Sequence, residues 1–351
     1  MDIRNFISFD DVDAAWWDSL YSLFRHIIAH PAEYHDACHG KLLASLFFES
    51  STRTRFSFQA AMLRLGGGVF GFANPNDSSI AKGESLADTM RMASTYSDVI
   101  VMRTTQEGAA KAASLYSEVP IINAGDGGHL HPTQTLTDLA TISMLRGKIG
   151  GFTVGLCGDL KYGRTVHSLV TALAKFRDVK FCMIAPKGLE MPEYMLRFMR
   201  AHGMEYTECN SLEEALGSLD ILYMTRIQRE RFVQKYDDHN PADLSDFILT
   251  VKKLQAATDD LIILHPLPRV DEIERAVDAD PRAKYFEQAK YGMYIRMSML
   301  LKFTMMPRRP VVPQAEGGHF CNNPVCVSQT ERYLPKLVTE NGACGYCDKA
   351  L

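Results

Sequence analysis

Residues 152–176 read FTVGLCGDLKYGRTVHSLVTALAKF, and this stretch decides the fold class of the chain. It opens with a short apolar run that is typical of a buried strand. After a polar loop, apolar residues recur three and four positions apart, as on one face of an amphipathic helix; they are Val166, Leu169, Val170 and Leu173. A strand followed by a covering helix is the repeating unit of a parallel sheet.

The same alternation of apolar runs and helical segments extends from residue 40 to residue 265. We expect strands at residues 42–48, 67–73, 98–102, 119–125, 152–158, 179–185, 220–224 and 260–265. We expect crossover helices at residues 52–66, 83–97, 132–146 and 163–176. With four strands before residue 130 and four after residue 150, the sequence predicts an α/β fold with two doubly wound parallel-sheet domains of similar size.

A chain of 351 residues is long enough for two such domains. We place the first at residues 1–134, completed by a C-terminal helix at 282–305, and the second at 135–281. Residues 306–318 include PRRPVVPQAEGG, whose Pro and Gly content is typical of a linker. A third, very small unit is expected at residues 319–351.

Composition limits the partners that we expect. The chain is 46% hydrophobic and 23% charged, with a formal net charge of −4, which argues against a general nucleic-acid partner. It contains no uncharged apolar run that approaches the ~20 residues needed to cross a bilayer, and its first residues lack an apolar signal segment. We therefore expect a cytoplasmic protein with no membrane partner. Four scattered cysteines, Cys38, Cys157, Cys182 and Cys209, are expected to be reduced core thiols.

Polar and mostly cationic residues follow the predicted strands at the point where each strand ends. The loop after 42–48 contains three hydroxyl-bearing residues and two arginines, Ser51–Arg55, at the start of a helix, where free N–H groups and the helix dipole favour an anion. Later strand ends carry Arg103, His131 with Gln134, Arg164, Arg226 with Gln228, and His265 with Arg269. One alternative is a set of capped helices with solvated arginines. The recurrence at one topological position favours a shared cleft that binds several negative charges.

The motifs of covalent catalysis are missing from this pattern. Neither a G-x-S-x-G nucleophile motif nor a dinucleotide-binding G-x-G-x-x-G motif is present. The residues suit two anionic substrates held side by side, with charge stabilised on a carbonyl and on a departing phosphate.

The chain resembles the catalytic chain of aspartate carbamoyltransferases over residues 1–305. The matching motifs are FFESSTRTRFSF, SSIAKGESLADT, VMRTTQEGAA, NAGDGGHLHPTQTLTDL, GDLKYGRTVHSL, YMTRIQRER and HPLPRVDEI. The resemblance implies carbamoyl transfer from carbamoyl phosphate to the amine of L-aspartate, giving N-carbamoyl-L-aspartate and phosphate, the committed step of de novo pyrimidine biosynthesis. It implies non-covalent catalysis with oxyanion stabilisation and no organic cofactor.

The resemblance also implies roles for individual residues. Carbamoyl phosphate is expected to bind to Ser51, Thr52, Arg53, Thr54, Arg103, His131, Gln134, Leu267 and Pro268, of which Arg53, Thr54, Arg103 and His131 are expected to be catalytic. Aspartate is expected to bind to Lys82, Arg164, Thr165, Arg226 and Gln228. Glu49 resembles the acid that ties the two domains together in the closed state, through Arg164 and Arg231.

In the family a serine and a lysine reach the active site of a neighbouring subunit. Ser79 and Lys82 correspond to them here, which implies a homotrimer or a dimer of trimers. Because the loop is one residue shorter between serine and lysine than in some relatives, Ser78 remains an alternative to Ser79.

Two alternative functions share features with this sequence. An ornithine carbamoyltransferase shares the S-T-R-T-R and H-P-T-Q motifs, but a cationic substrate side chain would not be placed beside Arg226. That family also usually carries a cysteine where this chain has Pro266. The second alternative, a non-catalytic scaffold relative, is disfavoured because all motif positions are filled.

The end of the chain carries four further cysteines, Cys321, Cys326, Cys344 and Cys347. Cys321 and Cys326 are separated by four residues, Cys344 and Cys347 by two, and the two pairs by seventeen. This spacing predicts a closed tetrahedral Zn²⁺ site with a structural role. Disulfides are the weaker alternative in a cytosolic setting. The balanced charges of this unit argue against a nucleic-acid-binding ribbon. It has too few apolar residues to fold without metal.

This C-terminal unit resembles the zinc domain of the aspartate carbamoyltransferase regulatory chain. The spacings agree, as does the C-x-x-C-[DE]-K ending at residues 344–349. The nucleotide-binding domain that precedes it in the regulatory chain has no room here, so we expect no CTP inhibition or ATP activation through such a domain. The surface to which the unit binds is not predicted by the sequence.

Overall fold

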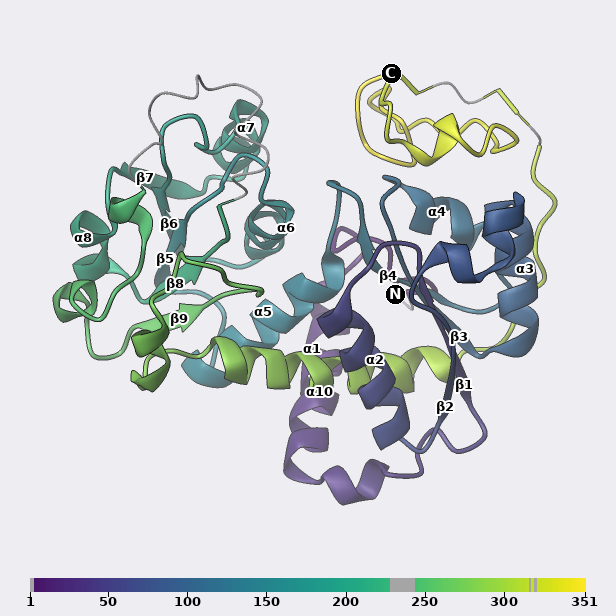
Figure 1. Ribbon diagram of the computed structural model, residues 1–351, viewed down its shortest axis with the longest axis horizontal. Helices are drawn as coiled ribbons and strands as arrows, with labels where there is room; N and C mark the ends of the chain where they lie inside the picture. The colour runs from purple at the N-terminus through teal and green to yellow at the C-terminus, as the bar shows by residue number, and fades with distance from the viewer. Residues whose placement is uncertain (1–2, 228–243, 316, 319–320) are drawn as a thin grey trace. The chain divides into compact units, whose positions relative to one another are not determined.

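The computed structural model describes residues 3–227, 244–315, 317–318 and 321–351. The chain divides into two compact units (Figure 1). Unit 1 comprises Met1–Leu136 and Gly292–Leu351, and unit 2 comprises Thr137–Tyr291. Two helices, α5 (Pro132–Arg146) and α10 (Tyr285–Thr304), contain the two points at which the chain passes between units.

Unit 1 is built on a four-stranded parallel sheet with the strand order β2-β1-β3-β4. The strands are β1 (Leu42–Phe47), β2 (Gly68–Phe72), β3 (Val99–Thr104) and β4 (Ile121–Asp126). Its helices are α1 (Ala14–Ala29), α2 (Thr52–Arg64), α3 (Leu86–Tyr96) and α4 (Ala109–Ser114). Every residue of β3 and β4 is buried. β3 is a central strand, and β4, at the edge of the sheet, is flanked by Phe6, which forms an isolated parallel bridge with Ile122.

Unit 2 is built on a five-stranded parallel sheet with the strand order β7-β6-β5-β8-β9. The strands are β5 (Phe152–Cys157), β6 (Val179–Ile184), β7 (Glu205–Cys209), β8 (Ile221–Met224) and β9 (Ile262–Leu264). Its own helices are α6 (Arg164–Leu173), α7 (Glu193–Ala201) and α8 (Leu212–Ala215). Short 3-10 helices in the two units lie at Pro31–Tyr34, Pro75–Asp77, Ser79–Lys82, Leu216–Ser218, Ser245–Phe247, Lys253–Ala256, Arg275–Ala279 and Val327–Gln329.

The predicted fold class of two doubly wound parallel-sheet domains is confirmed, with one strand more than expected. All eight predicted strands form. The additional strand, β7, lies at the edge of its sheet and is polar and largely exposed, so it lacks the apolar run on which the prediction depended. The prediction also contained no helix at α1, α4, α7 or α8. In α4 a run of alanines shows no contrast between faces, so periodicity could not reveal it.

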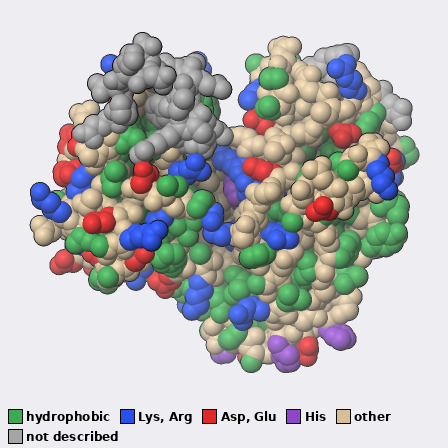
Figure 2. All heavy atoms as spheres, in the orientation of Figure 1, with side chains coloured by type: hydrophobic (Ala, Val, Ile, Leu, Met, Phe, Trp, Pro, Cys, Tyr) green, Lys and Arg blue, Asp and Glu red, His purple; other side chains and the backbone are tan. Residues whose placement is uncertain are grey.

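Three expectations from composition concern membrane spans, surface charge and the scattered cysteines. Among the described residues, no helix is long and apolar enough to cross a membrane. Figure 2 shows acidic and basic side chains interspersed over the visible face rather than gathered into one basic stripe. Cys38, Cys157 and Cys182 are buried and Cys209 is half-buried, and all four are free thiols.

Candidate active site and metal centre

The first cationic segment of unit 1 lies where β1 ends and α2 begins. Ser51 is the N-cap residue of α2, and its side chain makes no capping hydrogen bond. Thr52, Arg53 and Thr54 form the first turn, so their backbone N–H groups lie at the positive end of the helix. Partial burial and then the charge of Arg103 lower the pKa of Arg53. Two guanidinium groups close enough to repel each other, beside a helix N-terminus, form an arrangement that favours an anion.

Arg103 and His131 meet beside that segment. Arg103 is the fifth residue of β3 and is 9% exposed, and His131 directly precedes α5 and is 6% exposed. The Nη1 atom of Arg103 lies 3.3 Å from Nε2 of His131. Since a guanidinium only donates hydrogen bonds, Nε2 of His131 is the acceptor. The Nε atom of Arg103 donates to Glu49 at 3.0 Å, which orients the guanidinium. Gln134 lies one turn into α5, with its N–H bonded to the His131 carbonyl at 3.0 Å.

The two serines of the Ser78–Lys82 loop in unit 1 have different environments. The Ser78 hydroxyl donates to the Pro75 carbonyl at 2.7 Å and accepts from the Ile80 N–H at 3.4 Å. Ser79 and Lys82 are exposed. Ser78 therefore stabilises the loop, whereas Ser79 and Lys82 are presented on its surface.

Unit 2 also places cations at strand ends. Arg164 begins α6, and Arg226 lies two residues beyond β8. The Thr165 hydroxyl hydrogen-bonds the phenol of Tyr223, which donates to buried Asp138 at 2.9 Å. Burial and the neighbouring Asp138 raise the pKa of Tyr223. Gln228 and Arg231 lie outside the described residues.

The segment after β9 turns sharply at Leu267 and Pro268. Leu267 has φ 55°, in the left-handed region, and the Leu267–Pro268 peptide is cis. The Leu267 N–H donates to Nδ1 of His265 at 2.7 Å, so the imidazole proton lies on Nε2 and is donated to Glu272 at 2.7 Å. Although burial opposes ionisation, hydrogen bonds from His265 and from backbone N–H groups hold the pKa of Glu272 below its ordinary value. These bonds fix the backbone of the turn.

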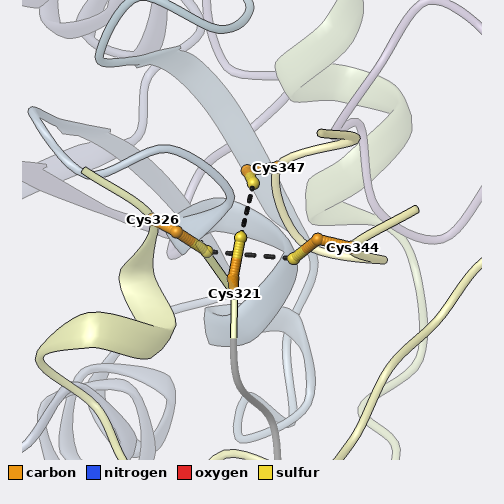
Figure 3. Close-up of side chains that lie close together, drawn as sticks. All are labelled: Cys321, Cys326, Cys344 and Cys347. Atoms are coloured by element: carbon orange, nitrogen blue, oxygen red, sulfur yellow. Dashed lines mark hydrogen bonds between the residues drawn. The ribbon is translucent and has the colours of Figure 1, made fainter. Parts of the chain in front are cut away.

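The four C-terminal cysteines converge with their sulfur atoms facing one another (Figure 3). The Sγ atoms of Cys321 and Cys347 are 3.6 Å apart, and those of Cys326 and Cys344 are 3.9 Å apart. A tetrahedron with metal–sulfur bonds of ~2.3 Å has edges of ~3.8 Å. All four thiols are free and buried, so the set fits a tetrahedral metal ion and is too widely spaced for disulfides.

Neighbouring groups donate hydrogen bonds to two of the sulfur atoms. The Asn323 N–H points to Sγ of Cys321 at 3.5 Å, and the Ser328 hydroxyl donates to Sγ of Cys326 at 3.3 Å. A hydrogen bond from the Cys326 thiol lowers the pKa of Cys347, whereas that bond and burial raise the pKa of Cys326, and burial raises that of Cys344. Hydrogen bonds of this kind orient ligands and stabilise the charged form that binds a metal.

The cysteine unit, residues 321–351, packs on unit 1's own α3 and α4. Its cysteines share one hydrophobic cluster with four buried alanines of α4, and Figure 1 shows the C-terminal segment beside that helix. Glu331 and the Tyr333 hydroxyl accept the first N–H groups of α3, at 3.2 and 2.9 Å. These helix N–H groups have no acceptor within the helix itself.

Two polar residues of unit 1 extend this contact. Glu107 is 5% exposed and accepts from Asn323 at 2.7 Å and from Lys349 at 2.8 Å. His129 lies between Asp126 at 2.9 Å and Asp348 at 3.0 Å. Burial alone would lower the pKa of His129, but the two carboxylates outweigh this effect and raise it to about 10. Sequence reasoning missed both residues, because neither segment shows that its partner lies more than 200 residues away.

Two doubly wound units whose strand ends carry arginines define a two-domain enzyme that binds anionic substrates. The model of the aspartate/ornithine carbamoyltransferase carbamoyl-phosphate-binding domain matches residues 4–144, and that of the Asp/Orn-binding domain matches residues 150–303. The chain belongs to the aspartate/ornithine carbamoyltransferase family. Neither model extends over the cysteine unit.

Individual relatives agree with this family. The chain is 54% identical over 285 residues to the aspartate carbamoyltransferase catalytic subunit of Clostridium botulinum, covering 81% of this chain and 92% of the relative. It is 50% identical over 299 residues to that of Finegoldia magna, covering 85% and 97%. The catalytic subunit of M. jannaschii aspartate transcarbamoylase superposes with a TM-score of 0.80 at 43% identity, covering 86% and 98%. The Trypanosoma cruzi enzyme in complex with carbamoyl phosphate and aspartate superposes with a TM-score of 0.78 at 38% identity, covering 85% and 95%.

Proposed function

We propose that the protein is an aspartate carbamoyltransferase, which transfers the carbamoyl group of carbamoyl phosphate to L-aspartate in pyrimidine biosynthesis. The observation that carries the proposal is the buried Arg103–His131 pair beside Arg53 and the N-terminus of α2, in a chain 50–54% identical to catalytic subunits of that name. That set of donors suits a phosphate joined to a carbonyl.

Carbamoyl phosphate is bound mainly by residues of unit 1. Ser51, Thr52, Arg53 and Thr54 hold the phosphate through side chains and the helix N-terminus. Arg103 bridges phosphate and carbonyl oxygen, and His131 with Thr54 polarises the carbonyl. Gln134 and the backbone at Leu267 and Pro268 hold the carbamoyl amide; the His265 and Glu272 bonds that fix this turn support that role.

The second substrate is an amino acid with two carboxylates. Arg164 with Thr165 binds its α-carboxylate, and Arg226 with Gln228 takes the β-carboxylate. Lys82 of a neighbouring subunit also binds aspartate. An ornithine side chain would bring a cation to Arg226, which Coulomb repulsion disfavours. The neighbouring Thr165–Tyr223–Asp138 hydrogen bonds give the start of α6 a fixed geometry.

The reaction needs no covalent enzyme intermediate. The aspartate amine attacks the carbamoyl carbon, and the tetrahedral oxyanion accepts hydrogen bonds from Thr54, Arg103 and His131. The C–O bond to phosphate then breaks, and the phosphate leaves with the amine proton. Each such donor stabilises the transition state by ~3 kcal/mol.

Complete sites require more than one copy of the chain. Ser79 and Lys82 contribute to the site of a neighbouring subunit in a homotrimer or a dimer of trimers. The engagement of Ser78 within its own loop supports Ser79 as the contributing serine.

The cysteine unit binds one structural Zn²⁺ through Cys321, Cys326, Cys344 and Cys347. Sulfur spacing and burial support this assignment, and four protein ligands leave no open position for catalysis. We propose residues 319–351 as a zinc domain after a linker at 306–318, by resemblance to the regulatory chain. Because only the linker separates it from α10, we expect no CTP inhibition or ATP activation through a nucleotide-binding domain between them.

A bisubstrate analogue provides the test. N-(phosphonacetyl)-L-aspartic acid is bound in a Trypanosoma cruzi relative. Calorimetric titration should show one tight site per chain, weakened strongly in Arg53→Ala and Arg164→Ala. Failure of the wild-type chain to bind the analogue would contradict the proposal.

A further inference from the structure

Two short segments of unit 1 connect the cysteine unit with the carbamoyl-phosphate residues. The first runs from Arg103 at the end of β3 to Gly108, and the second from Asp126 at the end of β4 to His131. The segments are bonded to each other, because the Gly127 N–H donates to the Thr104 carbonyl at 2.8 Å and the Gly108 N–H donates to Asp126 at 2.9 Å. A displacement of either segment is therefore transmitted to the other.

Glu107 connects the first segment to the cysteine unit through its backbone and its side chain. Its N–H donates to the Val325 carbonyl and its carbonyl accepts from the Val327 N–H, both at 2.9 Å. Its carboxylate accepts from Asn323 and Lys349. These partners lie next to Cys326 or two residues from Cys321 and Cys347, so the position of Glu107 depends on the metal-binding loops.

His129 connects the second segment. Both of its ring nitrogens face carboxylate oxygens, Asp126 on one side and Asp348 on the other, so both nitrogens donate. Asp126 is 1% exposed and also accepts from the Leu130 N–H at 3.0 Å. Because Leu130 directly precedes His131, the bridge ends beside the imidazole that polarises the substrate.

The two surfaces approach too closely to move independently. A Cβ placed on Gly108 would lie 2.4 Å from the backbone of Tyr346. Gly108 has φ 81°, which glycine adopts without cost. Small residues on the unit 1 side, including the alanines of α4, allow this direct packing.

We propose that Glu107 and His129 are positioning residues, through which the folded cysteine unit holds Arg103 and His131 and thereby sets the affinity for carbamoyl phosphate. The inference rests on the proposed function and deepens it. A unit that only stabilised the fold could bind anywhere on unit 1. Here, apart from the bonds of Glu331 and Tyr333 to the start of α3, its polar side-chain contacts with unit 1 fall on Gln106, Glu107 and His129, which lie within four residues of Arg103 or two of His131.

The test removes the His129–Asp348 and Glu107–Lys349 contacts by substitutions at residues that are not proposed to contact substrate. Asp348→Gly removes one carboxylate of the His129 bridge, and glycine accepts the φ of 60° found at Asp348. Glu107→Gln removes the charge that pairs with Lys349. Glu340→Gly is the matched control, since it removes an exposed acid from the same unit. Asp348→Asn is the conservative variant, because asparagine keeps an acceptor oxygen and tolerates a positive φ.

Each variant is assayed as the full chain after metal analysis has shown that its zinc content equals that of the wild type. We expect Asp348→Gly and Glu107→Gln to raise the Kd for inorganic phosphate and the KM for carbamoyl phosphate on the order of 10-fold, as when a coupled residue outside a site is removed. The KM for aspartate should change little. Asp348→Asn should restore most of the affinity, and Glu340→Gly should match the wild type. Hydrogen exchange should rise at residues 103–108 and 126–131.

Wild-type phosphate affinity in both zinc-loaded variants would overturn the inference. So would a uniform loss of kcat and both KM values that follows the unfolded fraction. Failure of the proposed function is distinguishable, because the wild-type chain itself would then form no N-carbamoyl-L-aspartate.

Discussion

Replacement of Arg103 by alanine tests the proposed chemistry at its most central residue. The substitution removes the guanidinium that contacts His131 at 3.3 Å and Glu49 at 3.0 Å. One lost oxyanion donor costs ~3 kcal/mol of transition-state stabilisation. At 1.36 kcal/mol per factor of ten, kcat/KM should fall by at least about 150-fold.

The effect on folding should be small enough to separate. The side chains of Arg103 and Glu49 are 11% and 30% exposed, so the stranded Glu49 carboxylate is partly solvated. Loss of a hydrogen bond to a charged group costs about 1.5–3 kcal/mol, against a total stability of about 5–15 kcal/mol. The variant should therefore stay folded.

Steady-state kinetics and thermal unfolding of the same preparation provide the assay. Arg64→Ala is the control, since Arg64 is an exposed arginine in the last turn of α2. Activity of Arg103→Ala within a few-fold of the wild type would refute the role of Arg103. Loss of activity only in proportion to unfolded protein would also refute it.

Three further predictions follow from other parts of the structure. Metal analysis should find one zinc per chain. A strong chelator should raise hydrogen exchange in residues 321–351 while both parallel sheets stay protected, because structural zinc supplies about 10–16 kcal/mol to such units. If residues 321–351 stayed protected after chelation, the metal assignment would be contradicted. Glu272→Gln should be less stable than the wild type at neutral pH. The difference in unfolding free energy should shrink as the pH falls below 4.5, the ordinary pKa of a glutamate, and through the lowered pKa of Glu272 in the folded protein. Urea unfolding at a series of pH values measures this difference. A pH-independent difference would contradict that pairing. Lys82→Ala and Arg103→Ala chains that are mixed and refolded together should regain activity that neither has alone, because Lys82 comes from the neighbouring subunit. A mixture of Arg103→Ala and His131→Ala chains should stay inactive. Equal results for both mixtures would argue against a shared site.

The sequence predicted the features that have a local cause. Apolar runs mark the buried strands, and the cationic strand ends follow from the parallel topology. The cysteine spacing predicted four sulfur atoms that the structure brings within 4.8 Å of one another. Polar β7 was missed because its residues at the sheet edge need no apolar pattern.

Contacts that depend on tertiary proximity could not be predicted. In the sequence, Glu107 has no feature that distinguishes it from other acidic residues. Only the folded structure shows that Asn323 and Lys349 contact its carboxylate. His129 lies in the motif GGHLHPTQ, in which only His131 was assigned a role. Its partner Asp348 lies 219 residues away in the sequence. The hydrogen bond from Ser78 to the Pro75 carbonyl is local, but it depends on how the loop folds, which the sequence did not predict.

Product formation by the purified wild-type chain tests the central claim most directly. Labelled carbamoyl phosphate is supplied with L-aspartate or with L-ornithine, and the carbamoylated amino acid is identified by mass spectrometry. We predict N-carbamoyl-L-aspartate and phosphate in equal amounts, and no citrulline. Citrulline as the main product, or no carbamoylated product from either amino acid, would contradict the account.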